Sequence, residues 1–424
     1  MKKSPLFDPS ASARTARVAP PVAALLIAIP LMDVGPEAAL WAAPAILLAA
    51  MVIAWAAESA QFFIAQGFAL AILAWLQTLP EFAVEAVLAW KQQVPLLMAN
   101  LTGALRLLTG LAWPMIYFTA AMFYRARTGR RLRKIVLSDG HSVEVVGLAV
   151  PLAYFAFIWW KGSLGLIDAG VLVAIYAAYL LVLAKMPPEE EEGIEDLELI
   201  PRTIVKSRKP VRIFLIGALF LTGGLLIYFM AEPFLGSLLA ISAMLGVPSF
   251  VFVQWVAPFV SEFPEKVSAF YWARTVNKAS MALMNMVSSN INQWTLLAAM
   301  LPLVYSISRG TPSVIVFDEQ QSLEVLMTLG QSLVGMLFLL NMELAWWEAA
   351  ALFGLWGIQF ALSPVPPGPG FFGHLATRIH VWTTGAYFVW FAAGMVSCLV
   401  GRRKFLAFTR FAALWRQHLK KGTA

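Results

Sequence analysis

The chain has 424 residues, of which 60% are hydrophobic and only 13% are charged, and its mean hydropathy is +0.74. A soluble domain is nearer half apolar and a quarter charged, so this composition excludes an ordinary soluble protein and predicts an integral membrane protein. The single cysteine, Cys398, excludes an intramolecular disulfide and a thiolate metal site. The net charge of +7 resides in loops and tails, where it indicates membrane orientation and not nucleic-acid binding.

Apolar runs predict about twelve membrane-spanning helices in two halves, residues 18–185 and 211–400. In the first half the spans are about 18–33, 38–57, 62–90, 95–124, 144–160 and 167–185. In the second half they are about 211–231, 247–273, 278–306, 322–341, 343–362 and 381–400. We therefore expect an all-α polytopic membrane protein.

Three polar segments flank these halves. Residues 1–17 form a basic N-terminal tail, and residues 186–210 form a charged segment whose acidic block predicts a solvated cytoplasmic linker. A regulatory cation-binding loop is the alternative for that linker. Residues 401–424 alternate basic and apolar side chains, which predicts an amphipathic helix on the anionic inner leaflet, with a poorly ordered tail as the alternative.

The distribution of Lys and Arg predicts the orientation in the membrane. Twelve spans place every basic segment on the cytoplasmic side, together with both termini, and leave the poorly basic loops 310–321 and 363–379 outside. The basic segments are 1–17, 125–134, 206–212, 274–278 and 402–421. We expect a protein of a prokaryotic inner membrane, in contact with lipid and with no nucleic-acid partner.

Two short motifs place a glutamate directly after a proline within apolar segments. They are Leu79-Pro80-Glu81-Phe82 and Phe263-Pro264-Glu265-Lys266, and Glu265 follows Glu81 by 184 positions. A carboxylate within hydrocarbon is costly and therefore indicates a functional site. The predicted topology runs the two segments in opposite directions, so they form inverted repeats with both glutamates near the membrane midplane.

Further oxygen-bearing residues accompany each motif. Carboxylate, amide and hydroxyl oxygens are the ligands that Na⁺ and Ca²⁺ prefer. In the first half they are Gln77, Thr78, Glu85 and Asn100, and in the second half Ser261, Glu262, Asn285, Ser289, Asn290, Asn292 and Gln293.

Structural roles are the alternative for several of these residues. The amide and hydroxyl side chains from Asn285 to Gln293 also suit hydrogen bonding between helices. Glu81 and Glu265 have Arg106 and Lys266 as possible ion-pair partners, and Glu262 has Lys266 one helical turn away. Glu85 and Glu262 fit equally well as direct ligands or as charges near the site.

The repeats, residues 76–108 and 260–295, resemble those of the sodium/calcium exchanger superfamily, the cation/calcium antiporters. The family pattern Gly-Thr-Ser-x-Pro-Glu corresponds to residues 76–81 and 260–265, and its Gly-Asn-x-x-Gly-Ser-Asn segment to 99–105 and 284–290. The resemblance implies a ten-helix core with one extra helix at each end and no cofactor. It also implies that Glu81 and Glu265 coordinate the transported metal cation, surrounded by Thr78, Asn100, Ser261, Asn285 and Ser289.

Repeat one departs from the family pattern. Ala104 and Leu108 stand where the family has polar residues, and Arg106 lies inside the segment. A guanidinium beside the glutamates would take the place of one transported ion and weaken Ca²⁺ binding by like-charge repulsion. Alternatively, Arg106 lies on the far face of its helix, where it extends to the membrane surface or pairs with Glu85.

Two apposed glutamates in a low dielectric need a proton or a cation between them, and this requirement predicts antiport. We expect Ca²⁺, or Na⁺, to be exchanged against Na⁺ or H⁺. The four histidines show no pattern typical of a metalloenzyme, so we do not expect an enzyme. A non-transporting sensor or scaffold, or a cation channel, is the alternative function.

Overall fold

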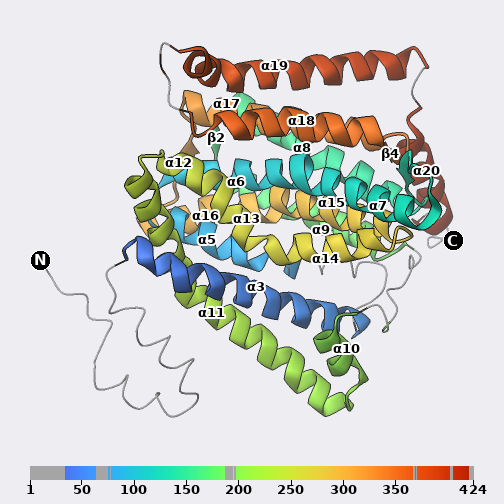
Figure 1. Cartoon of the computed structure of the whole chain (residues 1–424), viewed down its shortest axis with the longest axis horizontal. Helices are drawn as coiled ribbons and strands as arrows, with labels where there is room; N and C mark the ends of the chain where they lie inside the picture. Colours follow the sequence, from blue (N-terminus) through green and yellow to red (C-terminus); the bar gives the residue numbers. More distant parts are fainter. Residues whose placement is uncertain are drawn as a thin grey trace, which may run out of the picture.

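The computed structural model describes residues 34–63, 75–76, 78–186, 194, 197–365, 368, 370–401 and 404–419 (Figure 1). The predicted first span, 18–33, lies outside these residues, and so does Gln77. The fold is helical, as predicted, with two short β-ribbons in addition.

The two halves repeat one order of elements. The first half contains α3 (Ala39–Ala60), α5 (Leu79–Trp90), α6 (Val94–Leu107), α7 (Trp113–Thr128), β1 (Lys134–Val136), α8 (Ser142–Lys161), β2 (Ser163–Leu164) and α9 (Leu166–Leu183). The second contains α11 (Lys209–Leu245), α12 (Ser249–Val251), α13 (Ala257–Ser261), α14 (Phe263–Arg274), α15 (Ala279–Asn292), α16 (Ala298–Arg309), β3 (Ile315–Val316), α17 (Glu319–Leu339), β4 (Glu343–Ala345) and α18 (Trp346–Leu362). Outside this repeat lie α10 (Leu199–Lys206), α19 (Phe371–Leu399) and α20 (Leu406–Leu414).

The strand pairing shows that the halves are inverted. Helix α8 connects β1 to β2, and α17 connects β3 to β4. Because β1 pairs with β4 and β2 pairs with β3, α8 and α17 must run in opposite directions. The two ribbons therefore join corresponding helices of the halves at opposite ends of the molecule.

Seven helices among the described residues are long and apolar enough to cross a membrane. The predicted number of twelve spans stays a prediction, and the Pro-Glu segments are not single helices. Helix α5 begins at Leu79 and α14 at Phe263, each with a proline in its first turn. Proline has no N–H to donate to the preceding turn, so it starts a new helix more readily than it continues one.

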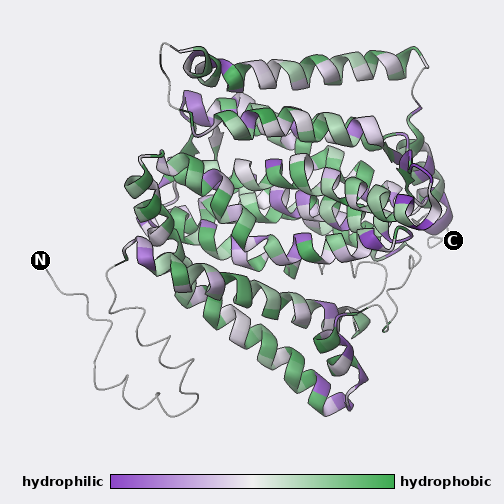
Figure 2. Ribbon diagram, in the orientation of Figure 1, coloured by the Kyte–Doolittle hydropathy of each residue, from purple (hydrophilic) through white to green (hydrophobic). Residues whose placement is uncertain are grey.

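Helices α6 and α15 lie at the centre of the molecule, between α3 and α11 on one side and α17 to α19 on the other (Figure 1). Each continues through a π-helical turn, η5 (Leu108–Ala112) and η8 (Gln293–Leu297), into α7 and α16 respectively. All residues from Met281 to Asn292 are buried. Figure 2 shows that the outer helices are mostly hydrophobic, as a surface facing lipid requires.

The predicted linker and the C-terminal tail each contain a helix that packs on the long apolar helices of the protein. Helix α10, in the predicted linker, packs on α3 and α11, and the indole Nε1 of Trp55 donates to Glu198 Oε2 over 2.7 Å. Helix α20 packs on α8, where Phe411 and Leu414 contact the main hydrophobic core. Arg410 forms an ion pair with Asp139. At least part of the apolar side of the tail is thus covered by the protein itself.

Candidate functional site

The helix breaks place both motif glutamates in the first turn of a new helix, Glu81 in α5 and Glu265 in α14. Unpaired backbone N–H groups give this end of a helix a partial positive charge, which favours a carboxylate there. The neighbouring Glu85 and Glu262 are equally deep, because none of the four side chains is more than 1% exposed. The protein therefore concentrates four buried acids around the two breaks.

Gln293 connects the acids of the two halves. Its Nε2 donates to Glu81 Oε2 over 2.8 Å and to Glu262 Oε1 over 2.7 Å. The other oxygen of Glu262 pairs with the Lys266 ammonium, as the spacing of these residues permits. Gln293 is the first residue of the π-helical turn η8, and π-helical turns often occur at functional sites.

The remaining two acids lie beside this network. Glu85 Oε1 accepts a hydrogen bond of 3.2 Å from Asn100 Nδ2 of α6. Glu265 interacts with Glu262, Lys266 and Ser289, and within the described residues neither of its oxygens accepts a hydrogen bond shorter than 3.5 Å. Glu81 interacts electrostatically with all three other acids and with Lys266. Four carboxylates and one ammonium thus share one buried region.

The predicted ligands divide into two groups. Asn100 on α6 contacts Glu85, Ser289 on α15 interacts with Glu265, and Asn285 is buried on α15. Other polar residues are engaged in contacts between or within helices. Thr78 accepts from Asn292 Nδ2 over 2.5 Å, Asn290 exchanges 3.2 Å hydrogen bonds with Thr109, and Ser261 donates to the Ala257 carbonyl over 3.0 Å. Asn290 therefore has the interhelical role that was the alternative reading.

Several buried oxygens at the site accept no hydrogen bond from the residues that the structure describes. They are Glu81 Oε1, Glu85 Oε2, Asn100 Oδ1, Asn292 Oδ1 and Gln293 Oε1. Across the described ranges, no three carboxylate, imidazole or thiol side chains lie close enough together to hold a metal ion. A cation at this site must therefore use amide and hydroxyl oxygens together with the carboxylates, or the carboxylates must move closer.

Arg106 lies on a side of α6 away from the four acids, as the second alternative predicted, but it does not extend to the membrane surface or pair with Glu85. Its guanidinium is fully buried, and Nη2 lies 2.5 Å from Glu324 Oε2 on α17. It neither joins the four acids nor pairs with Glu85. Arg106 follows Asn100 by six positions, which at 100° per residue is a rotation of about 240° around the helix. The two side chains therefore point to different sides of α6.

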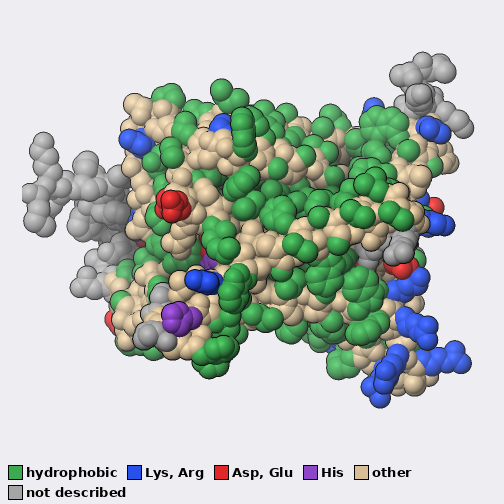
Figure 3. All heavy atoms as spheres, turned by 90° about the horizontal axis from the view of Figure 1, so that it is seen from above, with side chains coloured by type: hydrophobic (Ala, Val, Ile, Leu, Met, Phe, Trp, Pro, Cys, Tyr) green, Lys and Arg blue, Asp and Glu red, His purple; other side chains and the backbone are tan. Residues whose placement is uncertain are grey.

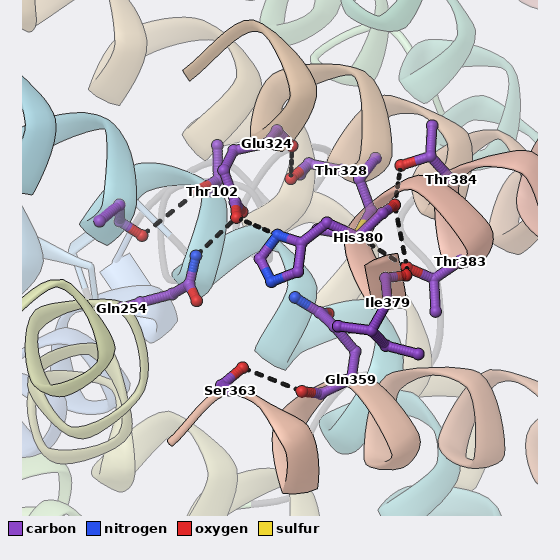
Figure 4. A network of polar contacts seen from close by, with 12 residues as sticks. Thr102, Gln254, Glu324, Thr328, Gln359, Ser363, Ile379, His380, Thr383 and Thr384 are labelled. Carbon is purple, nitrogen blue, oxygen red and sulfur yellow. Dashed lines mark hydrogen bonds and ion pairs between the residues drawn. The ribbon is translucent and has the colours of Figure 1, made fainter. Parts of the chain in front are cut away.

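The partners of Arg106 form a second buried polar cluster (Figure 4). Glu324 also accepts from Gln254 Nε2 over 2.9 Å and lies 2.6 Å from His380 Nδ1, and Figure 4 shows the three side chains converging from different helices. The Arg106 guanidinium lies 5.0 Å from the ring centre of Trp255. Glu324 was not among the residues predicted from the sequence, although it is an acid inside the apolar span 322–341, which is the signal that identified the motif glutamates.

Two inverted halves that bring buried acids from both repeats into one network define an inverted-repeat membrane transporter. A profile of the family described as "Sodium/calcium exchanger protein" matches residues 38–185 and 215–363. The chain belongs to this family. The match covers both repeats, as the resemblance in the motifs predicted. A search of curated protein sequences finds no significant match.

Solved structures share the fold. The H+/Ca2+ exchanger CAX is 30% identical with a TM-score of 0.79, and the match covers 95% of this chain and 96% of CAX. YfkE is 14% identical with a TM-score of 0.52, over 86% of this chain and 99% of YfkE. The sodium-calcium exchanger NCX_Mj is 20% identical with a TM-score of 0.51, over 77% of this chain and 98% of NCX_Mj. The last two similarities concern the fold alone.

Proposed function

We propose that the protein is a secondary active cation antiporter with a midplane site built on Glu81 and Glu265. It exchanges Ca²⁺, or Na⁺, for Na⁺ or H⁺ by alternating access. The observation that supports this proposal is the network in which Gln293 joins Glu81 of the first half to Glu262 of the second, which in turn interacts with Glu265. Ca²⁺ and H⁺ are the first pair to test, because the 30% identical relative is described as an H+/Ca2+ exchanger.

The charge of the site supports coupled exchange. Glu81 interacts with the three other buried carboxylates, and among the described residues the ammonium of Lys266 is the positive charge that these interactions include. Like charges in a low dielectric are costly, and either protons or a metal cation relieve this cost. If the protein changes from its inward-open to its outward-open state only when the charge of the site is neutralised, the site cannot return empty. It must therefore carry one ion in each direction, which is exchange.

Gln293 has a specific part in this proposal. Its NH₂ group cross-links Glu81 and Glu262, while its Oε1 accepts no hydrogen bond from the described residues. Rotation of the amide would replace a donor by an acceptor at the same place. When the NH₂ group faces the two carboxylates, it occupies their oxygens and no cation is bound there. When the amide is rotated, its oxygen faces the site and serves as a ligand of the cation.

The test is a flux assay in proteoliposomes that contain a Ca²⁺-sensitive dye, driven in separate samples by a pH gradient and by a Na⁺ gradient. Glu81→Gln and Glu265→Gln are each expected to reduce gradient-dependent Ca²⁺ flux to the level of empty liposomes. Glu343→Gln is the matched control, because Glu343 pairs with Lys134 at the surface, away from the site. Undiminished flux in both site variants would refute the assignment.

The same assay separates the alternative functions. Ca²⁺ flux that needs no counter-ion gradient and appears as single-channel current indicates a channel. Ca²⁺ binding that requires Glu81 and Glu265 without any flux indicates a sensor or scaffold. A flux that follows the pH gradient or the Na⁺ gradient identifies the counter-ion.

We further propose that the protein lies in a prokaryotic inner membrane with both termini in the cytoplasm and the C-terminal tail near anionic lipid. Figure 3 shows Lys and Arg side chains projecting at the right-hand end of a mostly hydrophobic surface. An open cleft of about 1400 Å³ along the C-terminal half of α7 and the segment that follows it is lined by Arg125, Arg130, Arg131 and Arg133 beside Trp346, a combination suited to lipid phosphates. In a Cys398→Ala background, single cysteines introduced at Arg130 and at Thr311 test this orientation: an impermeant thiol reagent added to one side is expected to label only one of them, and labelling of both from the same side would contradict it.

A further inference from the structure

Lys266 is a buried base inside the candidate cation site. It directly follows Glu265 on α14, is 5% exposed, and places its ammonium against Glu262. The ammonium also interacts electrostatically with Glu81 and with Glu265. A positive charge on a flexible stem is thus surrounded by carboxylates from both halves of the protein.

A purely stabilising ion pair explains this arrangement poorly. Pairs one helical turn apart contribute only about 0.2–0.5 kcal/mol on exposed helices. When such a pair is buried, the cost of desolvating both charges offsets most of their attraction, and an apolar pair often serves as well. In addition, the carboxylate that holds Lys266 is bonded through Gln293 to Glu81. The pair is therefore part of the network that a transported cation must enter.

We propose that Lys266 is a tethered cation that occupies one cation position of the exchanger site and thereby sets its ion specificity. An entering metal ion competes with the ammonium for Glu262 and is repelled by it. Because Coulomb repulsion scales with charge, the ammonium disfavours a divalent ion more than a monovalent one. This inference rests on the proposed function and names the residue that determines which cations the site accepts.

The neighbouring charges identify Lys266, and not Arg106, as the base that faces the acids of the site. Arg106 is held by Glu324, Gln254 and the Thr102 carbonyl in the second cluster, on another side of α6. The repulsion that the sequence suggested for Arg106 is therefore exerted by Lys266 instead. Ser268, also on α14, donates to Glu58 Oε1 over 3.1 Å and brings no further positive charge.

The experiment measures Ca²⁺ and Na⁺ binding to the purified full-length protein by titration calorimetry. Lys266→Gln removes the charge and is expected to tighten Ca²⁺ binding at least tenfold, and Na⁺ binding by a smaller factor. Lys266→Arg keeps a positive charge and is expected to restore weak Ca²⁺ binding. Lys134→Gln is the matched control, because it breaks an ion pair with Glu343 at the surface and is expected to leave both affinities unchanged.

A second measurement distinguishes an occupied position from a merely structural one. In Lys266→Ala, methylammonium in solution is expected to compete with Ca²⁺ for the position that the side chain leaves, whereas it has no such effect on the unmodified protein. Unchanged or weaker Ca²⁺ binding in Lys266→Gln, or no competition by methylammonium in Lys266→Ala, would overturn the inference.

Failure of the proposed function gives a different result. If Ca²⁺ binding is lost in Glu81→Gln and Glu265→Gln but unaffected by Lys266→Gln, only the role of Lys266 is refuted. If Ca²⁺ binding is indifferent to both glutamates, the site itself is wrong, and the role of Lys266 is refuted with it. If binding depends on the glutamates and tightens in Lys266→Gln while flux is absent, the tethered cation stands and transport does not.

Discussion

Replacing Glu324 by glutamine is expected to destabilise the protein strongly, because it leaves the Arg106 guanidinium buried without a counter-charge. Arg106 is 0% exposed and Glu324 is 1% exposed, and their closest nitrogen and oxygen lie 2.5 Å apart. The substitution keeps the size of the side chain and its ability to accept one hydrogen bond. Its effect combines the loss of the charge with the loss of one of the two carboxylate oxygens that serve Arg106, Gln254 and His380.

The magnitude follows from the geometry. At 2.5 Å and an effective dielectric constant of about 20, the attraction is roughly 7 kcal/mol. Desolvation offsets part of this value in the intact pair, and removal of one partner from a buried pair typically costs about 3–5 kcal/mol. Removal of both charges, in Arg106→Leu with Glu324→Leu, should cost less than Glu324→Gln alone, because no unpaired charge remains.

The assay is reversible unfolding in mixed detergent micelles, which gives the free energy of unfolding of each variant. Glu343→Gln is the control, since its 2.5 Å pair with Lys134 has side chains 26% and 49% exposed. Exposed pairs contribute about 1 kcal/mol or less, so this control should lose little. The double variant completes a thermodynamic cycle for the buried pair.

Two results would refute the reasoning. A loss of less than about 1 kcal/mol in Glu324→Gln would show that water solvates the Arg106 charge or that another acid pairs with it. A double variant as unstable as the single one would show that packing, and not the unpaired charge, accounts for the loss.

Two further predictions concern the contacts around the central helices. Gly103→Ala should destabilise the protein by roughly 1–3 kcal/mol, because a Cβ atom there would lie 1.9 Å from the backbone carbonyl oxygen of Gln254. Gly217→Ala is the control in the same unfolding assay and should be neutral or stabilising, because its Cβ would meet nothing within 4 Å. Equal effects of the two substitutions would contradict the close approach of the backbone at Gly103 to that at Gln254. Gln293→Leu should lower Ca²⁺ affinity about tenfold or more, because it removes the link between the acids of the two halves and one amide oxygen. Calorimetry measures this loss, and affinity equal to that of the unmodified protein would exclude Gln293 from the site.

The sequence predicted the overall organisation because the relevant signals are local. Composition identifies a membrane protein, and the 184-residue offset between Glu81 and Glu265 identifies the repeats. The effect of proline on its own turn explains why α5 and α14 begin where the motifs lie. The family resemblance of the motifs was likewise confirmed by the profile match to both halves.

The same signals could not predict which side chains meet. Arg106 pairs with Glu324, which is 218 positions away, and helical spacing places each residue on a face without identifying the helix opposite. The sequence therefore suggested Arg106 as a fixed charge beside the motif glutamates, whereas the structure pairs Arg106 with Glu324 and brings Lys266 against Glu262. Nor did residue spacing distinguish Asn290, which bonds Thr109, from its neighbour on the same stretch of helix, Gln293.

Hydrophobicity, charge and proline act within a few residues of the chain, and for this reason the sequence alone predicted an inverted-repeat membrane protein with a glutamate inside an apolar segment of each half. That Gln293 bridges the two repeats and that Arg106 pairs with Glu324 became evident only from the packing of the helices. The physical reason is that a buried charge must find a partner among the groups that face it. Which groups those are depends on how closely the helices approach one another.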